Sequence, residues 1–239
     1  MTAAPTPNSP SPEFETFDAI GWPVAGDAAG VARSIAEGRP VDLDNPRGVP
    51  LPAFPDTVTD GSEDATGRVV VTEMEPQLVL SHASVPTVVL SPPTLIVGMG
   101  CNAGVEVDEL RTHLDRVLAE QLLTRGSVAA IASLDTKADE PGLLALASEM
   151  GLPLLTYPSE ALADQNVPTP SDVVAAVTGT PSVAEAAVVA AGAELIVPKH
   201  VASLSTVAVG RLPQPTSGAG SSDDSSSDGS AADGTSGAR

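Results

Sequence analysis

Between residues 94 and 211, short runs of purely apolar residues alternate with segments of helical periodicity. Strands that are apolar on both faces have to be covered on both faces. The alternation therefore predicts an α/β fold, a single α/β sandwich domain with a mostly parallel sheet over residues 94–212. The strands are predicted at 94–97, 128–134, 153–157, 194–197 and 206–211, and the helices at 105–123, 141–150, 171–177 and 182–191. We expect the last two strands to pair as a hairpin.

The composition restricts what the core of this domain can contain. Hydrophobic residues make up 42 % of the chain, but aromatic residues make up only 2 %. The core must therefore be built from valine, leucine, isoleucine and alanine. An aromatic platform on which nucleic-acid bases stack is absent from such a composition.

The flanking regions carry fewer apolar residues. Residues 14–93 contain one amphipathic helix at 27–37, two short predicted strands at 68–72 and 85–90, and many prolines. We interpret them as a poorly structured lead-in, a partial middle or linker region. Residues 1–13 are rich in proline and serine and are predicted to be a disordered arm. The last segment, 213–239, is rich in serine, glycine and aspartate and is predicted to be a disordered tail.

The charge balance excludes several classes of partner. The chain has 31 acidic and 11 basic residues, a net charge of −20. Binding to duplex nucleic acid or to an anionic membrane surface needs clustered lysine and arginine, which this sequence lacks. No apolar run approaches the roughly 20 residues that span a bilayer, and the N-terminus has no secretory signal. With one cysteine there is no internal disulfide and no cysteine-rich zinc site. We expect a cytoplasmic protein without a bound metal.

A glycine-rich segment follows the first strand of the predicted domain and contains Gly98, Gly100, Cys101 and Gly104. Such a turn before a helix lets backbone N–H groups approach an anion. The spacing differs from the dinucleotide fingerprint, so a nucleotide-binding domain is the weakest of the alternatives. Two interpretations stay open, a carboxylate or phosphate pocket and a tight turn that needs glycine. Cys101 also has two open interpretations. It is either a nucleophilic thiol whose pKa the helix N-terminus lowers, or a small residue that fills a tight turn.

A second segment, at 132–142, follows the strand at 128–134 and opens a helix. Ligands of open α/β sheets bind at the carboxyl ends of the strands. Lys137 is therefore predicted to hold a substrate carboxylate, and Asp135 or Glu140 to act as acid or base. The alternative is that Asp139 and Glu140 only favour the helix N-terminus.

Two further segments contain candidate binding residues. Thr180 and Ser182 lie in a turn before a helix, where Ser182 and Glu185 have the spacing of a capping box. Lys199 and His200 end the fourth predicted strand and would supply positive charge, or would be exposed residues of a hairpin turn. His82 and His113 are interpreted as incidental, because neither has a metal-binding partner at helical spacing.

Taken in order, these segments resemble one family. GMGCNAGV, ASLDTKADEPGLL, GTPSVAEAA and the LIVPK and TVAV strands are similar to the C-terminal domain of the CobE/CbiG proteins of cobalamin biosynthesis. The resemblance covers about residues 94–211. It implies a corrin-ring precursor as partner, with other cobalamin-pathway enzymes as further partners, and no cofactor, since cobalt would be part of the substrate. CbiG proteins are cobalt-precorrin-5A hydrolases, which open a δ-lactone on the macrocycle and release acetaldehyde; CobE is a stand-alone C-terminal domain with an auxiliary role.

The sequence departs from the family in three places. It has no segment like the Ser-Gly-His-x-Gly-Gly stretch of the CbiG N-terminal domain. Asn102 and Ala103 stand where the family commonly has arginines, and 201–204 replace the usual basic and glycine residues after Lys199. Two functions therefore stay open, the hydrolase or its C-terminal part, and a non-catalytic module that binds or hands on a precorrin. A precorrin carries many carboxylates, so an acidic chain must bind it through a small basic pocket.

Overall fold

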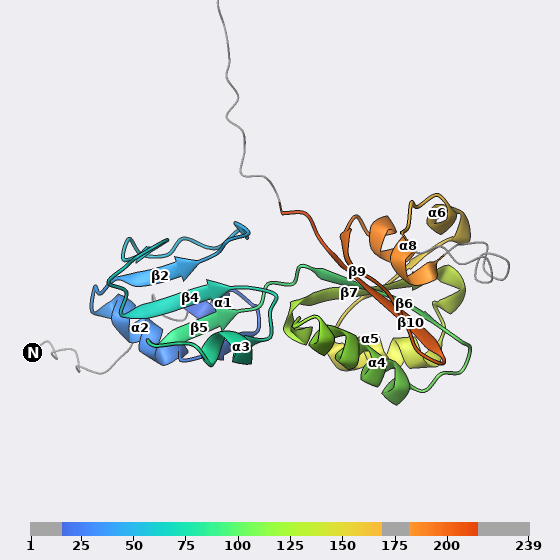
Figure 1. The fold of residues 1–239 in the computed structure, drawn as a ribbon, viewed down its shortest axis with the longest axis horizontal. Helices are drawn as coiled ribbons and strands as arrows, with labels where there is room; N and C mark the ends of the chain where they lie inside the picture. Colours follow the sequence, from blue (N-terminus) through green and yellow to red (C-terminus); the bar gives the residue numbers. More distant parts are fainter. Residues whose placement is uncertain (1–15, 169–181, 215–239) are drawn as a thin grey trace, which may run out of the picture.

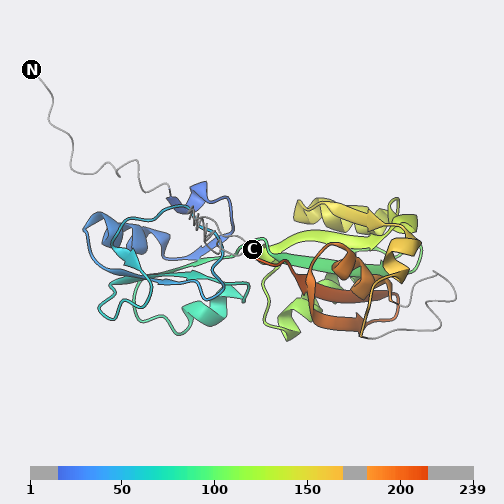
Figure 2. The same ribbon diagram turned by 90° about the horizontal axis from the view of Figure 1, so that it is seen from above.

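The computed structural model describes residues 16–168 and 182–214, which form two lobes, each built on a five-stranded sheet (Figure 1). The first lobe spans residues 16–90 and the second begins at residue 95. In the view from above, the lobes again lie side by side along the long axis, joined at one end of each (Figure 2). The predicted α/β class is confirmed. The arm at 1–13 and nearly all of the tail at 213–239 fall outside the described residues.

The first lobe combines short strands with three helices. Its strand order is β1-β5-β4-β2-β3, with β1 antiparallel to β5 and the other pairs parallel. The side chain of Asp27 caps the longest helix by accepting a hydrogen bond from the Gly30 N–H at 2.8 Å. The elements are α1 (Thr16–Ala19), β1 (Val24–Gly26), α2 (Ala28–Ala36), β2 (Val41–Asp44), β3 (Val58–Thr59), β4 (Gly67–Val71), α3 (Pro76–Leu80) and β5 (Thr87–Leu90).

The prediction of a poorly structured lead-in is corrected by this lobe. It has a buried core of its own, to which α2 contributes Val31 and Ile35 and the sheet contributes Val41, Val69 and Val88. The strands are only two to five residues long, which is too short to show a clear alternation along the sequence. The prolines that argued against a sheet lie in the connections between strands, where they cost no ladder hydrogen bonds.

The second lobe is the predicted α/β domain. Its strand order is β8-β7-β6-β10-β9, in which β6, β7 and β8 are parallel and β10 runs antiparallel to both β6 and β9. Four of the five strands therefore point the same way. The elements are β6 (Leu95–Cys101), α4 (Val107–Glu120), η1 (Arg125–Ser127), β7 (Val128–Leu134), η2 (Asp135–Lys137), α5 (Pro141–Met150), β8 (Leu154–Tyr157), α6 (Ser159–Ala163), α8 (Val183–Ala190), β9 (Glu194–Val201) and β10 (Ser205–Arg211).

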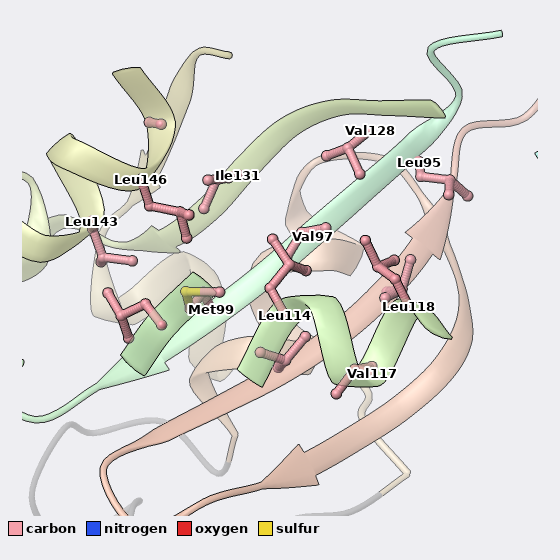
Figure 3. Close-up of a cluster of buried hydrophobic side chains, with 14 of the residues drawn as sticks. Leu95, Val97, Met99, Leu114, Val117, Leu118, Val128, Ile131, Leu143 and Leu146 are labelled. Carbon is pink, nitrogen blue, oxygen red and sulfur yellow. The ribbon is translucent and has the colours of Figure 1, made fainter. Parts of the chain in front are cut away.

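Helices cover both faces of this sheet (Figure 1). Leu95, Val97 and Met99 of β6 point toward α4 and α5, and Figure 3 shows them packed among the leucines of these helices. Ile96 points to the opposite face, where the alanine-rich α8 packs with α6. This alternation is the period-two pattern of a strand buried on both sides. The predicted hairpin of the last two strands is confirmed, while the predicted helix at 171–177 lies outside the described residues.

The glycine-rich segment begins as a strand, not as a turn. Gly98 and Gly100 lie within β6, and the turn begins only after Cys101. A Cβ atom on Gly98 would clash with the backbone carbonyl of Ala184, because α8 lies directly on the strand at this point. Only Gly104, with φ of 75°, needs glycine for its backbone conformation. Gly98 is therefore explained by the close packing of α8 on the strand, whereas a Cβ atom on Gly100 would crowd the Oγ1 of Thr206 on the neighbouring strand β10.

The two lobes are joined through a buried glutamate. Glu73, which follows β4, is 4 % exposed and accepts two hydrogen bonds from the Arg211 Nε, at 2.9 and 2.7 Å. The Oγ1 of Thr94 donates to the same carboxylate at 2.6 Å. Backbone hydrogen bonds run alongside, from the Thr124 N–H to the Glu73 carbonyl at 2.8 Å. This junction lies at the end of the second sheet where β6 begins and β10 ends.

Candidate functional site

The far end of the second sheet collects most of the predicted site residues. Since β6, β7, β8 and β9 all point the same way, their carboxyl ends meet at one edge of the sheet, which we call the carboxyl edge. Cys101 ends β6 at this edge, and Ser205, its partner in the ladder, begins β10. Lys137 follows β7, and Lys199 lies near the end of β9. Open α/β sheets bind ligands at this edge.

The centre of this edge is a carboxylate bound by a lysine and a backbone amide. Glu140 Oε1 accepts a hydrogen bond from the Gly104 N–H at 2.6 Å, and its Oε2 lies 3.0 Å from the Lys137 Nζ. The Glu140 side chain is 8 % exposed and that of Lys137 is 20 % exposed. The hydrogen bond from Lys137 and that from Gly104 hold the pKa of Glu140 below its ordinary value. Glu140 is thus ionised and bound at neutral pH, which is unfavourable for a general acid.

Cys101 is partly buried beside this cluster. Burial raises the pKa of the Cys101 thiol; the charge of Lys137 acts in the opposite direction, and that of Glu140 raises the pKa further. The direction is opposite to the one that an activated nucleophile requires. The thiol is therefore protonated at neutral pH and is best described as a half-buried group at the wall of the site.

Asp135 lies on the solvent side of the same turn. It opens the short helix η2 directly after β7 and is exposed, and the Ala138 N–H binds its backbone carbonyl at 2.9 Å. Because Asp135 is already exposed, a ligand over the carboxyl edge can contact its carboxylate without a rearrangement of the turn.

His200 lies on the face of the sheet that α4 covers. It pairs with Val207, whose side chain is in the core under α4, and its Nδ1 lies 3.6 Å from the Glu120 Oε2 at the end of that helix. Lys199 lies where the pairing of β9 with β10 shifts by one residue, and its backbone N–H donates to Glu185 of α8. Both residues lie within the strand and not in the hairpin turn.

The two lysines share the carboxyl edge. β7 and β9 are separated by β6 and β10, so at the usual strand spacing they lie about 14 Å apart. The exposed side chains of Val201 and Leu204 lie at the tip of the β9–β10 hairpin, on the same side of the sheet as Lys199. The carboxyl edge thus has a lysine near each of two strands and exposed apolar side chains at the hairpin.

The predicted capping box is absent from the start of α8. Ser182 occupies the N-cap position, but its side chain makes no capping hydrogen bond, and its buried Oγ has no hydrogen-bond partner among residues 16–168 and 182–214. Glu185 is fully buried and uses Oε1 to accept a hydrogen bond from the Lys199 N–H at 3.0 Å. The carboxylate thus connects α8 with β9. Thr180 lies outside the described residues.

His113 was missed by the sequence analysis. It lies in α4, is 3 % exposed, and its Nδ1 is 2.7 Å from the Ser205 Oγ at the carboxyl edge. Burial lowers the pKa of His113, as do the charges of Arg116 and His200, whereas Glu120 acts in the opposite direction. The signal that could have found it is its place on the apolar face of α4, between Leu110 and Leu114.

Two kinds of feature are absent from the described ranges, 16–168 and 182–214. No cluster of three or more histidine, cysteine, aspartate or glutamate side chains there is arranged to hold a metal ion. Within the same ranges, no helix has both the length and the apolar character needed to cross a bilayer.

Comparisons with known proteins converge on one family. Residues 95–210 match the protein family described as Cobalamin synthesis G C-terminus. The chain is 36 % identical over 110 residues to the cobalt-precorrin-5A hydrolase of Priestia megaterium, covering 46 % of this chain and 29 % of that protein. It is 37 % identical over 120 residues to protein CobE of a Sinorhizobium species, covering 48 % of this chain and 78 % of that protein.

A solved structure is also similar to this chain. The crystal structure of CobE, a protein from the cobalamin biosynthetic pathway, shares 35 % sequence identity with this chain, with a TM-score of 0.48, and the match covers 55 % of this chain and 96 % of that one. The chain thus spans less than a third of the hydrolase that it matches but most of CobE. The second lobe, with the carboxyl edge, coincides with the matched residues. This chain belongs to the CobE/CbiG C-terminal family of cobalamin-biosynthesis proteins.

Proposed function

We propose that this chain binds a corrin-ring precursor at the carboxyl edge of its second sheet and acts in cobalamin biosynthesis as a CobE-like module. The single observation that carries this proposal is the match over residues 95–210, which includes every strand that ends at the edge. The names of the relatives supply the substrate class, because they are a cobalt-precorrin-5A hydrolase and a cobalamin-pathway protein.

The chemistry of the edge suits such a ligand. A corrin precursor has an apolar macrocycle with acetate and propionate groups around its rim. In this proposal, Lys137 and Lys199 bind carboxylates on the rim of the ring, and the exposed Val201 and Leu204 at the hairpin tip contact the macrocycle. His200 lies on the face of the sheet covered by α4, so it would supply positive charge to the ligand from that face only. The chain carries a net charge of −20, so binding depends on these local cations and weakens when they are removed.

The remaining predicted residues have different places in this proposal. The Gly104 N–H is bound to Glu140, Gly98 allows the close approach of α8 to the strand, and Gly100 leaves room for the Oγ1 of Thr206. Cys101 is a half-buried, protonated thiol beside this cluster. Ser182, whose buried Oγ has no hydrogen-bond partner among the described residues, is the group at the start of α8 that would bind a carboxylate.

The sequence identity to the hydrolase favours a second candidate function, hydrolysis of the precursor lactone. In that reaction water adds to the acyl carbon and the acyl–oxygen bond breaks, which gives a carboxylate and an alcohol. The alcohol then loses its hydroxyl proton as its carbon–carbon bond to the ring breaks, which releases acetaldehyde, and the ring carbon takes up a proton. Neither an oxidant nor a cofactor is needed. Asp135 is the candidate base that accepts the proton of water, because it is exposed at the edge while Glu140 is bound on both oxygens. Lys137 would orient the substrate.

The test is anaerobic incubation of the purified chain with cobalt-precorrin-5A, with bound pigment and released acetaldehyde followed together. Bound pigment without acetaldehyde supports the binding module, and acetaldehyde above the background rate supports the hydrolase. Replacing Lys137 by glutamine should weaken pigment binding about ten-fold, because a charged hydrogen bond contributes about 1.5 kcal/mol or more. Asp135→Asn should leave binding intact and abolish any acetaldehyde release. Asp164→Asn, at an exposed site in the same lobe, is the matched control. Absence of both signals contradicts the proposal.

A further inference from the structure

The carboxyl edge already holds a carboxylate. One backbone N–H, that of Gly104, and one ammonium, that of Lys137, bind the two oxygens of Glu140 at 2.6 and 3.0 Å. We call these two donors the cradle. A backbone amide paired with a cation is a typical way for a protein to bind the carboxylate of a ligand. Here the bound group belongs to the chain itself.

Glu140 is not needed to place the helix that it precedes. Gly142 in the first turn of α5 packs so closely that a Cβ atom there would clash with the backbone carbonyl of Val105. Leu143 and Leu146 of the same helix are fully buried in the core under the sheet. Since α5 is fixed by packing, the side chain of Glu140 can leave the cradle without loss of the fold.

The hydrogen bonds of the cradle are also of a kind that lets one carboxylate replace another. Glu73 at the lobe junction is bound by the planar guanidinium of Arg211 through two N–H groups, and by a hydroxyl as well. Glu140 has a single bond from a flexible ammonium and a single bond from an amide, and Lys137 keeps a fifth of its side chain exposed. An incoming carboxylate can therefore reach Lys137 from solvent.

From these contacts we propose that Glu140 is an internal stand-in for a carboxylate of the ligand, which displaces it from the Gly104 N–H and Lys137 on binding. This inference rests on the proposed function for the identity of the ligand but not for the chemistry of the cradle. The exchange replaces one carboxylate by another in the same two bonds, so the free energy of these bonds is largely conserved. The affinity of the wild-type chain is lowered because each ligand has to compete with Glu140.

The cradle can be tested without a macrocycle. Cys101 is the one cysteine of the chain and lies close enough to Lys137 and Glu140 for both charges to act on its thiol. Cys101 is alkylated with neutral iodoacetamide, and the extent of alkylation is measured by mass spectrometry. A ligand bound at the cradle should slow this alkylation. Tricarballylate, a small tricarboxylate, is titrated at constant ionic strength, and the concentration that gives half-maximal protection is compared between variants. Comparing midpoints removes the effect of each substitution on the intrinsic reactivity of the thiol.

We expect saturable protection of Cys101. The midpoint should be about five-fold lower in Glu140→Gln than in the wild type, because the Glu140 carboxylate no longer competes with tricarballylate for the charged hydrogen bond from Lys137. Glu140→Asp, which keeps the charge but is one methylene shorter, should lower the midpoint in the same direction, and Lys137→Gln should abolish protection. Glu194→Gln, at an exposed site on β9, is the matched control. Thermal melting verifies that each variant is folded.

An unchanged or raised midpoint in both Glu140 variants overturns the proposal, as does the absence of saturable protection in every protein. These failures differ from a failure of the proposed function. If Glu140→Gln lowers the tricarballylate midpoint but the wild type binds no cobalt-precorrin-5A, the cradle is right and the macrocycle is wrong. If the pigment binds and the midpoint does not fall, the function stands and Glu140 is only a structural link.

Discussion

The two ends of the second sheet each have a buried glutamate, but they bind it in different ways. At the lobe junction, Glu73 has bonds from Arg211 and from Thr94, and backbone hydrogen bonds run alongside. At the carboxyl edge, Glu140 has one bond from Lys137 and one from the Gly104 N–H. A fork of two parallel N–H groups fixes a carboxylate in one geometry, whereas an ammonium acts as a mobile point charge. The comparison indicates that the junction is built for stability and the carboxyl edge for exchange.

The largest effect is expected at the junction. Replacing Glu73 by alanine leaves the guanidinium of Arg211 and the hydroxyl of Thr94 without their acceptor in a buried place. Breaking a buried pair in this way costs about 3 kcal/mol or more. Chemical denaturation should show this loss in the free energy of unfolding, while Glu63→Ala at an exposed site in the same lobe should show almost none. A loss below about 1 kcal/mol, typical of surface pairs, would contradict the structural role assigned to the junction.

A smaller loss is expected in the middle of the sheet. Gly98→Ala places a methyl group against the carbonyl of Ala184 in α8, so the helix has to move away from the strand. Overpacking of this kind costs about 1–3 kcal/mol. Gly104→Ala is the informative comparison, because a Cβ there meets nothing within 4 Å and the cost comes only from the positive φ. Equal losses in the two variants would mean that α8 can shift freely.

The elements that the sequence predicts well are those whose signal is local. The strand at 128–134 and the helix at 141–150 were predicted with the bounds that the structure has, because apolar continuity, a proline at the first turn and a glycine cap mark them. The left-handed Gly151, with φ of 65°, is the cap that ends α5. Helix α4 ends three residues before the predicted position because Leu122 adopts a φ of 56°.

Features that depend on contacts between distant residues could not be predicted. Gly98 looked like part of a turn because its neighbour in α8 is more than eighty residues away along the chain. His113 looked incidental because Ser205, its partner, lies 92 positions later. The same holds for Glu140, whose acid–base role was argued from position alone, while the bond from Gly104 spans 36 residues. The order of strands in the first lobe was likewise invisible in its short segments.

A pH dependence is expected from the carboxyl edge. Because the pKa of His113 is lower in the folded chain than in the unfolded chain, the unfolded chain binds more protons as the pH falls below the ordinary histidine range. Stability should therefore decrease as the pH falls through that range. His113→Asn, which keeps a polar atom for Ser205, should make the stability depend less on pH. The measurement is thermal melting from about pH 8 to about pH 5, a range that spans the ordinary pKa of histidine. His82→Asn, at an exposed site in the first lobe, is the matched control.

The smallest effect on stability is expected at Ser182. An ordinary N-cap serine contributes about 1 kcal/mol to its helix. The Oγ of Ser182 makes no such bond and is buried without a partner in the described part of the chain, so Ser182→Ala should change the free energy of unfolding by less than about 0.5 kcal/mol. The same variant should weaken binding of cobalt-precorrin-5A, measured by pigment retention, if this hydroxyl binds a carboxylate. A loss of 1 kcal/mol in stability with unchanged pigment retention would mark Ser182 as an ordinary cap.

The position of β10 has a consequence for how the chain folds as it is synthesised. Among the described residues β10 is the last strand along the sequence, yet it lies between β6 and β9, and its contact with Gly100 spans 106 residues. Until Arg211 has left the ribosome, one side of β6 has no partner and presents unpaired backbone groups. The first lobe is complete by Leu90 and can fold while the rest is still being made. A chain interrupted after β6 but before residue 205 would thus carry a finished first lobe beside an aggregation-prone, half-built sheet.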